Sequence, residues 1–241
     1  MKNAALDTIN AHSADGYFNF CVPLSMLLGF CEDYRHIVFN AHHELILIRS
    51  RNDNNCLHGS LALEPKVELF KIQWRMPHVL SNDFNKLTLL RTLQNDRYLS
   101  MSFCLWDLYE FPLLHNTTKH VWPVKTATNL EKPRYVIFAL QTGRKNVMAE
   151  NITQFDNSNL INAKLHLNSE CYPYDDMNLD FAKRRYAILY DMYKRFRTSY
   201  YGYNSADVWL TTHDFLRQGS FVVFDCLPQN ESIKSALWMC E

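Results

Sequence analysis

Short stretches in which apolar and polar residues alternate recur along most of the chain, and they constrain its fold more than any other feature. Alternation with a period of two is typical of β-strands. Polar segments rich in Asn and Asp separate these stretches, and no regular succession of strand and helix indicates a parallel sheet. The predicted strands are Tyr17–Leu24, His43–Arg49, Lys66–Trp74, Tyr98–Phe111, Val121–Thr126, Arg134–Thr142, Ala163–Asn168 and Ser220–Cys226.

Three segments predict helices within this strand-rich chain. One short helix is expected over Ser25–Tyr34, and a second is expected to run from a cap at Ser81 to about Leu93. A longer helix is predicted over Asp180–Ser199, because its apolar residues form one stripe at helical spacing. That stripe consists of Ala182, Tyr186, Leu189, Tyr193 and Phe196. The predicted fold class is therefore all-β with a few helices, as a β-sandwich with helical insertions.

The length and charge of the chain favour an assembling subunit. Its 241 residues suffice for one large β domain or two smaller ones. The 25 Lys and Arg residues balance 25 Asp and Glu residues. Nucleic-acid-binding proteins usually carry a basic excess, whereas a neutral protein is less protected against self-association.

The cysteines and the N-terminal segment bear on location. The seven cysteines are widely spaced and form no CxxC pair, so a zinc ribbon is not indicated. Several lie in apolar runs, where a reduced cysteine packs as a small apolar residue. The N-terminal segment is polar, and the longest apolar runs are too short to span a bilayer. We therefore expect an intracellular protein, in the cytoplasm or nucleus, without a membrane partner.

The chain carries none of the common motifs of catalytic and cofactor sites. The sequence has no GxSxG, no GxGxxG and no GxxxxGK[ST]. His115 and His120 fit a surface turn better than a metal chelate, and Asp175 and Asp176 fit the start of a helix better than a catalytic dyad. We expect no catalytic residue, no metal ligand and no cofactor, so the protein is predicted not to be an enzyme.

Aromatic residues crowd the predicted strand Tyr98–Phe111. A core strand of a sandwich explains this pattern, and so does a subunit interface, where Trp and Tyr are enriched. The candidates for an interface are Trp106, Tyr109 and Phe111.

Basic residues gather on the predicted helix Asp180–Ser199, with Tyr190 and Tyr200 nearby. Interleaved cations and aromatic rings can bind single-stranded nucleic acid or an acidic partner. The solvated face of an amphipathic helix explains the same pattern, so both interpretations stay open. The candidate contact residues are Arg184, Arg185, Arg195 and Arg197.

Longer motifs follow one another in a fixed order. They are VPLS at 22–25, GFCEDYR at 29–35, WRMPHV at 74–79, WDLYEFPLL at 106–114, TKHVWPVKT at 118–126, EKPRYVI at 131–137, LNSECYPYDDMNLD at 167–180, SYYG at 199–202 and DCLPQNESIKS at 225–235. With these motifs the chain resembles, over about Phe18–Ser235, the double jelly-roll major capsid proteins encoded by Polinton (Maverick) elements, which are virus-like DNA transposons.

This resemblance implies two stacked jelly rolls in each chain and a homotrimeric capsomer that tiles a shell around DNA. It implies a structural role in a virion and no catalytic residues. Residues 1–95 are then expected to hold the C-terminal part of the first roll and a linking helix. Residues 96–241 are expected to hold the second roll, with the inserted helix near 180–199.

The ends of the chain depart from the family pattern. The chain enters the first roll late, near the strand that begins at Tyr17, and Ala236–Glu241 does not look like the closing strands of the family. Both rolls are therefore expected to be truncated, with open sheet edges. Two functions follow: a structural capsid-like protein that packs against copies of itself, or a domesticated or degenerate remnant. The remnant would bind proteins, such as related capsid proteins, or nucleic acid.

Overall fold

The computed structural model describes residues 17–38, 42–59, 65–94, 103–111, 113–124, 133–167, 170–202, 209–226 and 236–240. The chain divides into two compact units, which are described separately. The first unit consists of Met1–Leu47 and Leu69–Tyr109, and the second of Ile48–Glu68 and Glu110–Glu241. This division does not test the predicted boundary between two jelly rolls near Asn95, which stays a prediction.

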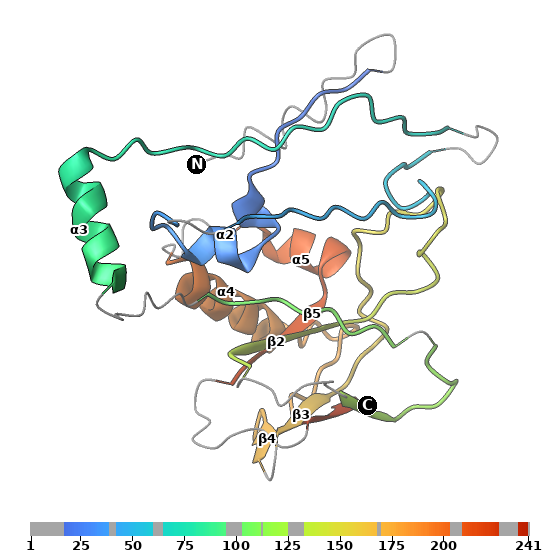
Figure 1. Ribbon diagram of the computed structural model, residues 1–241. Helices are drawn as coiled ribbons and strands as arrows, with labels where there is room; N and C mark the ends of the chain where they lie inside the picture. The colour runs from blue at the N-terminus through green and yellow to red at the C-terminus, as the bar shows by residue number, and fades with distance from the viewer. Residues whose placement is uncertain are drawn as a thin grey trace. The chain divides into compact units, whose positions relative to one another are not determined.

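The second unit contains a four-stranded antiparallel sheet (Figure 1). Its strands, in spatial order, are β1 (His120–Val124), β6 (Ala236–Cys240), β3 (Ala163–Leu167) and β4 (Glu170–Tyr172). The alternation along β3 sets the two faces of the sheet, because its first, third and fifth side chains are buried and the two between them are not. Thus Leu165 faces the core, while Lys164 on the outer face pairs with Asp176.

A two-stranded antiparallel sheet, β2 (Tyr135–Ala139) and β5 (Phe221–Asp225), packs between this core and a helix. Val222 and Phe224 join the main core together with Leu165. Val223, which points to the other side, packs in a second cluster with residues of β2 and of the helix α4 (Ala187–Tyr201). The strand β5 is therefore covered on both faces.

The helix α4 starts later than predicted. The predicted start at Asp180 is wrong, because residues 181–184 form a turn in which Arg184 has a left-handed φ of 59°. The main-chain groups of Asp180 and Arg185 hydrogen-bond to each other and close this turn. The helix ends at Gly202, whose φ of 67° is that of a left-handed cap. The shorter helix α5 (Thr212–Gln218) is capped by Thr211, whose hydroxyl accepts a hydrogen bond from the main chain.

The described residues of the first unit form three helical elements. The predicted helix Ser25–Tyr34 is instead two pieces, the 3-10 turn η1 (Leu24–Met26) and the helix α2 (Gly29–Asp33). The helix α3 (Asp83–Gln94) confirms the predicted second helix. Its cap is Asn82 and not Ser81, since the Asn82 side-chain oxygen accepts a hydrogen bond from the third residue beyond it, at 3.1 Å.

The predicted strands of the first half form no ladder in the described part of the chain, so these strand predictions are wrong there. They are Tyr17–Leu24, His43–Arg49, Lys66–Trp74 and the described part of Tyr98–Phe111. Figure 1 shows them as open, drawn-out runs of chain without strand arrows. A strand needs a hydrogen-bonding neighbour as well as a suitable pattern, and no described segment of the first unit supplies one.

Predictions in the second half fared better. The strands β1, β2, β3 and β5 confirm the predictions that covered them. No strand was predicted at the last described residues, and there the structure has β6, which pairs with both β1 and β3.

Candidate self-association surfaces

The aromatic segment 103–111 is held at its first end by helix α2. The ring of Phe103 meets that of Phe30 edge-on, with the centroids 5.2 Å apart. The backbone N–H of Cys104 donates a hydrogen bond to the Asp33 carboxylate at 2.7 Å. Gly29 makes this approach possible, because a Cβ there would lie 1.7 Å from the Cys104 carbonyl oxygen.

The last two residues of the segment, Glu110 and Phe111, belong to the second unit and make contacts within it. The ring of Phe111 stacks on Trp122 of β1 at 5.4 Å, and Trp122 in turn meets Phe138 of β2 at 5.8 Å. Glu110 forms an ion pair with Lys145, in which both side chains are largely exposed. Each end of the segment is thus anchored within the unit to which it belongs, which limits the conformational entropy that these residues lose when they are covered.

The middle of the segment is open to solvent. Leu105 and Leu108 are strongly exposed, and Trp106, Tyr109 and Phe111 each expose about half of their surface. All three predicted interface residues therefore lie on one anchored, solvent-facing segment. Whether they contact another subunit stays a prediction.

Apolar exposure extends through the described part of the first unit, where no side chain is buried. The buried apolar residues of the described chain all belong to the second unit, between Tyr135 and Cys226. The most exposed apolar side chains of the first unit, each at least half exposed, include Tyr17, Phe18, Leu27, Ile37, Ile46, Leu47, Leu69, Phe70, Ile72, Val79, Leu80, Phe84, Leu87, Leu105 and Leu108. A soluble monomer rarely exposes this much apolar surface.

Hydrogen bonds among Arg49, Asp53 and Val67, called here the clamp, connect the two ends of the loop that joins two of these apolar runs. The guanidinium of Arg49 donates to the Asp53 carboxylate and to the Val67 carbonyl, both at 2.7 Å. The other oxygen of Asp53 accepts the Val67 N–H at 3.0 Å. The hydrogen bonds from Arg49 and from Val67 lower the pKa of Asp53. The clamp fixes the two ends of the loop beside each other.

Asparagines fasten the same loop to the rest of the second unit. Asn55 exchanges hydrogen bonds with Asn146, through its side chain at 3.1 Å and with the Asn146 N–H at 2.6 Å. Asn54 donates to the carbonyl of Asn146, and Gly59 donates to that of Met148. Because Asn146 has a left-handed φ of 67°, a residue type that tolerates this region is needed there.

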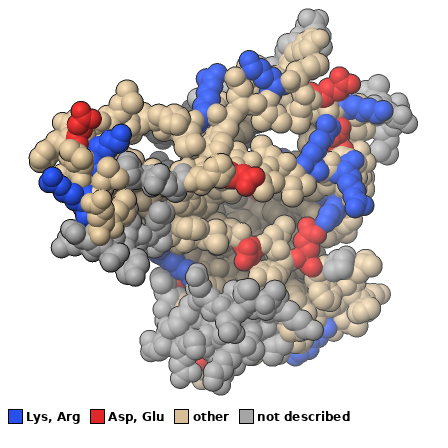
Figure 2. All heavy atoms as spheres, in the orientation of Figure 1, with Lys and Arg blue, Asp and Glu red and all other residues tan. Residues whose placement is uncertain are grey.

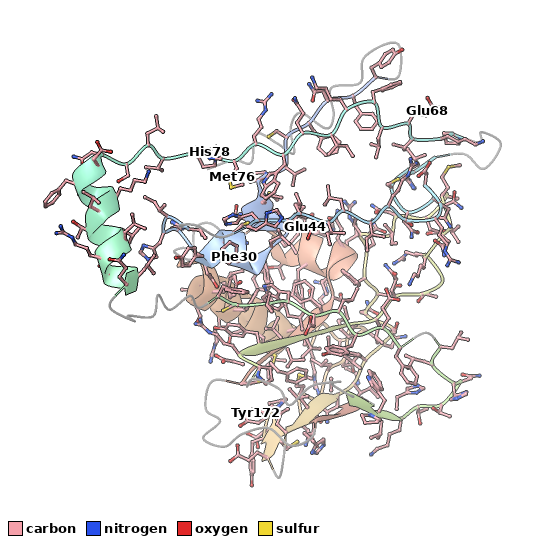
Figure 3. The ribbon with its side chains drawn as sticks, in the orientation of Figure 1. Phe30, Glu44, Glu68, Met76, His78 and Tyr172 are labelled. Carbon is pink, nitrogen blue, oxygen red and sulfur yellow. The ribbon has the colours of Figure 1, made fainter. Side chains whose placement is uncertain are left out.

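A hollow of about 210 Å³ lies beside β5. Its wall includes residues from both faces of that strand, Val223 and Phe224. Its other lining residues are Tyr135, Tyr172, Pro173, Met192, Arg195, Phe196 and Asp225. Tyr172, labelled at β4 in Figure 3, donates its hydroxyl to Glu170 at 2.6 Å, and this hydrogen bond together with burial raises the pKa of Tyr172 to about 12. The hydroxyl therefore stays a protonated donor near neutral pH.

Comparison with protein families identifies the chain. Residues 1–238 match the family model of the double jelly roll-like domain. The chain belongs to this family. No curated protein matches the chain, and no solved structure does. The family supports a capsid-like structural fold for this double jelly roll-like protein, whose short strands and few helices are consistent with a mostly-β chain.

The four candidate arginines of this double jelly roll-like protein do not share one face. Arg184 and Arg185 are exposed on the turn before α4, and Arg195 pairs along the helix with Asp191 at 2.7 Å. Arg197 is buried, with its guanidinium over the rings of Tyr201 at 4.8 Å and Trp209 at 4.5 Å. Figure 2 shows basic and acidic side chains side by side on the face in view, with wide uncharged areas between them.

The spacing of the helix contains a signal for the burial of Arg197. This residue lies one turn after Tyr193, so it continues the buried stripe of Leu189, Tyr193 and Phe196. The sequence did not lead us to predict this burial, because the basic residues of the helix were grouped by their charge and not by their position around the helix axis. The hollow beside β5 was not predicted either, because no local motif marks it.

The described residues contain no group of three or more His, Cys, Asp and Glu side chains placed to hold a metal ion. Asp176, of the adjacent pair noted above, accepts hydrogen bonds from Lys164 and Asn162, and these lower its pKa. Within the described part of the chain, no helix is long and apolar enough to cross a membrane.

Proposed function

We propose that this double jelly roll-like protein is a structural, capsid-like subunit that acts by packing against copies of itself. It performs no catalysis and needs no cofactor. Membership of the double jelly roll-like family supports the capsid-like fold. The proposal extends that family-level statement to a specific role for this chain.

One observation carries the proposal. The described first unit has no buried apolar side chain, whereas the second unit has a core of 17 buried apolar residues. Ordering a chain costs conformational entropy that only burial of apolar surface offsets. The first unit therefore needs a covering partner, and a second copy of the chain supplies apolar surface of the same kind.

The finer features of the proposal follow from the resemblance to Polinton and Maverick capsid proteins. The chain carries two jelly rolls, and three copies form a capsomer-like ring. Trp106, Tyr109 and Phe111 lie at the contact between copies. Their half-exposed rings on an anchored segment suit this role, since an interface anchor combines rigidity with accessible apolar area.

Sedimentation velocity over a wide range of protein concentrations tests this function. We expect oligomers that include a trimer, and a weaker association when Leu108→Asp places a charge on the aromatic segment. The control is Ile161→Asp, which changes an aliphatic residue of the second unit that is also more than half exposed. A clean monomer at the highest concentration overturns the proposal.

A second candidate function is that of a remnant that binds nucleic acid or another protein. It is favoured by the exposed, adjacent cations Arg184 and Arg185 on a turn. Binding to single-stranded DNA is then expected to weaken steeply with salt and to be lost in a double Arg→Ala variant at these positions. DNA binding that survives this variant rejects the turn as the contact, and an absence of salt-dependent binding rejects the function.

A further inference from the structure

The helix α3, labelled in Figure 1, has one exposed apolar side. Phe84 is 74% exposed and Leu87 is 54% exposed, and Leu90 is exposed as well. These residues recur every three positions, so they lie along one side of the helix. The opposite side carries the half-buried residues of α3, which are Leu89, Thr92 and Leu93. The helix therefore presents apolar side chains to solvent on the side away from those that it partly covers.

Opposite charges lie at the two ends of the exposed side. Asp83 is in the first turn of α3, and Arg91 is in the last turn. On a regular helix they lie about 40° to either side of Leu87, and Phe84 and Leu90 lie about 60° to either side of it. These five residues, called here the α3 face, are therefore arranged symmetrically about Leu87. Asp83 and Arg91 do not meet within one helix, because neighbours on a helix are three or four positions apart.

The symmetry of the α3 face selects a second copy of the same helix as its partner. When two α3 helices pack antiparallel with Leu87 at the centre, Phe84 of one copy comes level with Leu90 of the other. Asp83 of one copy likewise comes level with Arg91 of the other, within reach of its long side chain. The same contacts recur at the other end, because a two-fold axis relates the two copies. A parallel pair would instead place like charges beside each other, which is unfavourable.

We propose that α3 of one copy packs antiparallel against α3 of a second copy and joins one capsomer-like trimer to the next. This contact rests on the proposed function, which supplies the trimer. A two-fold contact closes on itself and cannot build a three-fold ring, so it is distinct from the contact within a trimer.

The area of the α3 face sets the strength of this contact. Phe84, Leu87 and Leu90 together expose roughly 300 Å² in each copy, given about 150–250 Å² for a large aromatic side chain. Two copies therefore bury less than the total of about 1,200 Å² at which stable complexes begin. We expect a weak, reversible contact between trimers, whose partner choice depends on the charges at its ends.

A charge swap tests the antiparallel pairing. Asp83→Lys and Arg91→Glu each place like charges at both ends of the contact, so each variant is expected to weaken the association of trimers about tenfold. The double variant restores opposite charges at both ends and is expected to return to within about threefold of the unmodified protein. An effect on helix stability alone predicts the reverse. Both substitutions oppose the helix dipole, so the double variant would then be worse than either single variant.

Two further variants bracket the charge swap. The matched control is Lys86→Glu, which changes the net charge as much as Arg91→Glu does. Lys86 lies about 100° around the helix from Leu87, off the α3 face, so this variant is expected to alter association by no more than about twofold. Leu87→Asp places a charge at the centre of the contact and is expected to weaken the association of trimers about 100-fold or more. Circular dichroism confirms that each variant stays folded.

Sedimentation velocity distinguishes this contact from the proposed function. The variants of the α3 face are expected to lose species larger than a trimer and to keep the trimer, whereas Leu108→Asp is expected to lose the trimer. The α3 contact is overturned if larger species persist in Leu87→Asp, if the double variant associates no better than the single variants, or if the unmodified protein stops at a trimer. The structural function stands in each of these cases.

The remaining outcomes concern the trimer. A protein that forms dimers but no trimer, and whose dimers follow the charge swap, supports the pairing of α3 and overturns the trimeric capsomer. A protein that stays monomeric at the highest concentration overturns the proposed function and the α3 contact together.

Discussion

Two leucine truncations of identical chemistry are expected to differ widely in their effect on folding. Leu189 of α4 is 1% exposed and packs in the main core with Phe215 and Val222. Leu80 precedes α3 and is 99% exposed. Leu189→Ala removes buried methyl groups and leaves a cavity, which typically costs about 3–5 kcal/mol of unfolding free energy. Leu80→Ala removes surface that is already hydrated, so a change within about 0.5 kcal/mol is expected.

Urea denaturation at a protein concentration below that of self-association measures both values, with circular dichroism as the signal. In thermal unfolding the Leu189 variant is expected to lose about 6–20 °C, since one kcal/mol corresponds to roughly 2–4 °C for a unit of this size. The reasoning is refuted if Leu189→Ala costs less than about 1 kcal/mol, because the second unit then lacks the core described here. It is refuted equally if Leu80→Ala costs as much as Leu189→Ala.

Three further perturbations test other parts of the structure. The pKa of Asp156 is lowered because hydrogen bonds, including those from Arg144, outweigh the effect of burial. The stabilising effect of the Asp156 carboxylate is therefore present above the unfolded pKa of about 4 and is lost as the pH falls through the folded pKa. The urea concentration at the unfolding midpoint should thus decrease when the pH is lowered below about 4, and it should decrease less in Asp156→Asn than in the unmodified protein. Thr211→Ala removes the cap of α5 and should cost about 1 kcal/mol in urea denaturation. Gly29→Ala forces the backbone at Cys104 to move, so limited proteolysis should cut segment 103–111 faster; an unchanged cutting rate contradicts the close contact.

The sequence predicted two kinds of element correctly. They are those stabilised by contacts between residues close in sequence and those whose apolar pattern fits only one type of secondary structure. Helix α3 follows from its periodicity, and β3 follows from a strict alternation whose buried side the structure confirms. Phe196 belongs to the predicted stripe of α4 and is buried. The start of α4 was misplaced, because the left-handed turn at Arg184 depends on main-chain bonds that residue type alone does not reveal.

The strands of the first half were predicted from an alternation that is necessary for a strand but not sufficient. His43–Arg49 alternates as clearly as β3 does, yet only β3 has neighbours on both sides among the described residues. Strand pairing joins residues far apart in sequence, and a pattern within one segment carries no information about its neighbour.

Burial of Val222 and Val223 on opposite faces of β5 shows that the second unit has enough internal apolar contact to order itself. The described first unit has no equivalent, and Ile48, at the border between the units, stays exposed. If a second copy covers the apolar residues of the first unit and Ile48, the fraction of molecules in which they are ordered depends on protein concentration, whereas the order of β5 does not. Folding of the first unit and assembly then become one equilibrium. A structural subunit gains from this coupling, because its apolar segments are ordered only where a neighbouring copy is present to receive them.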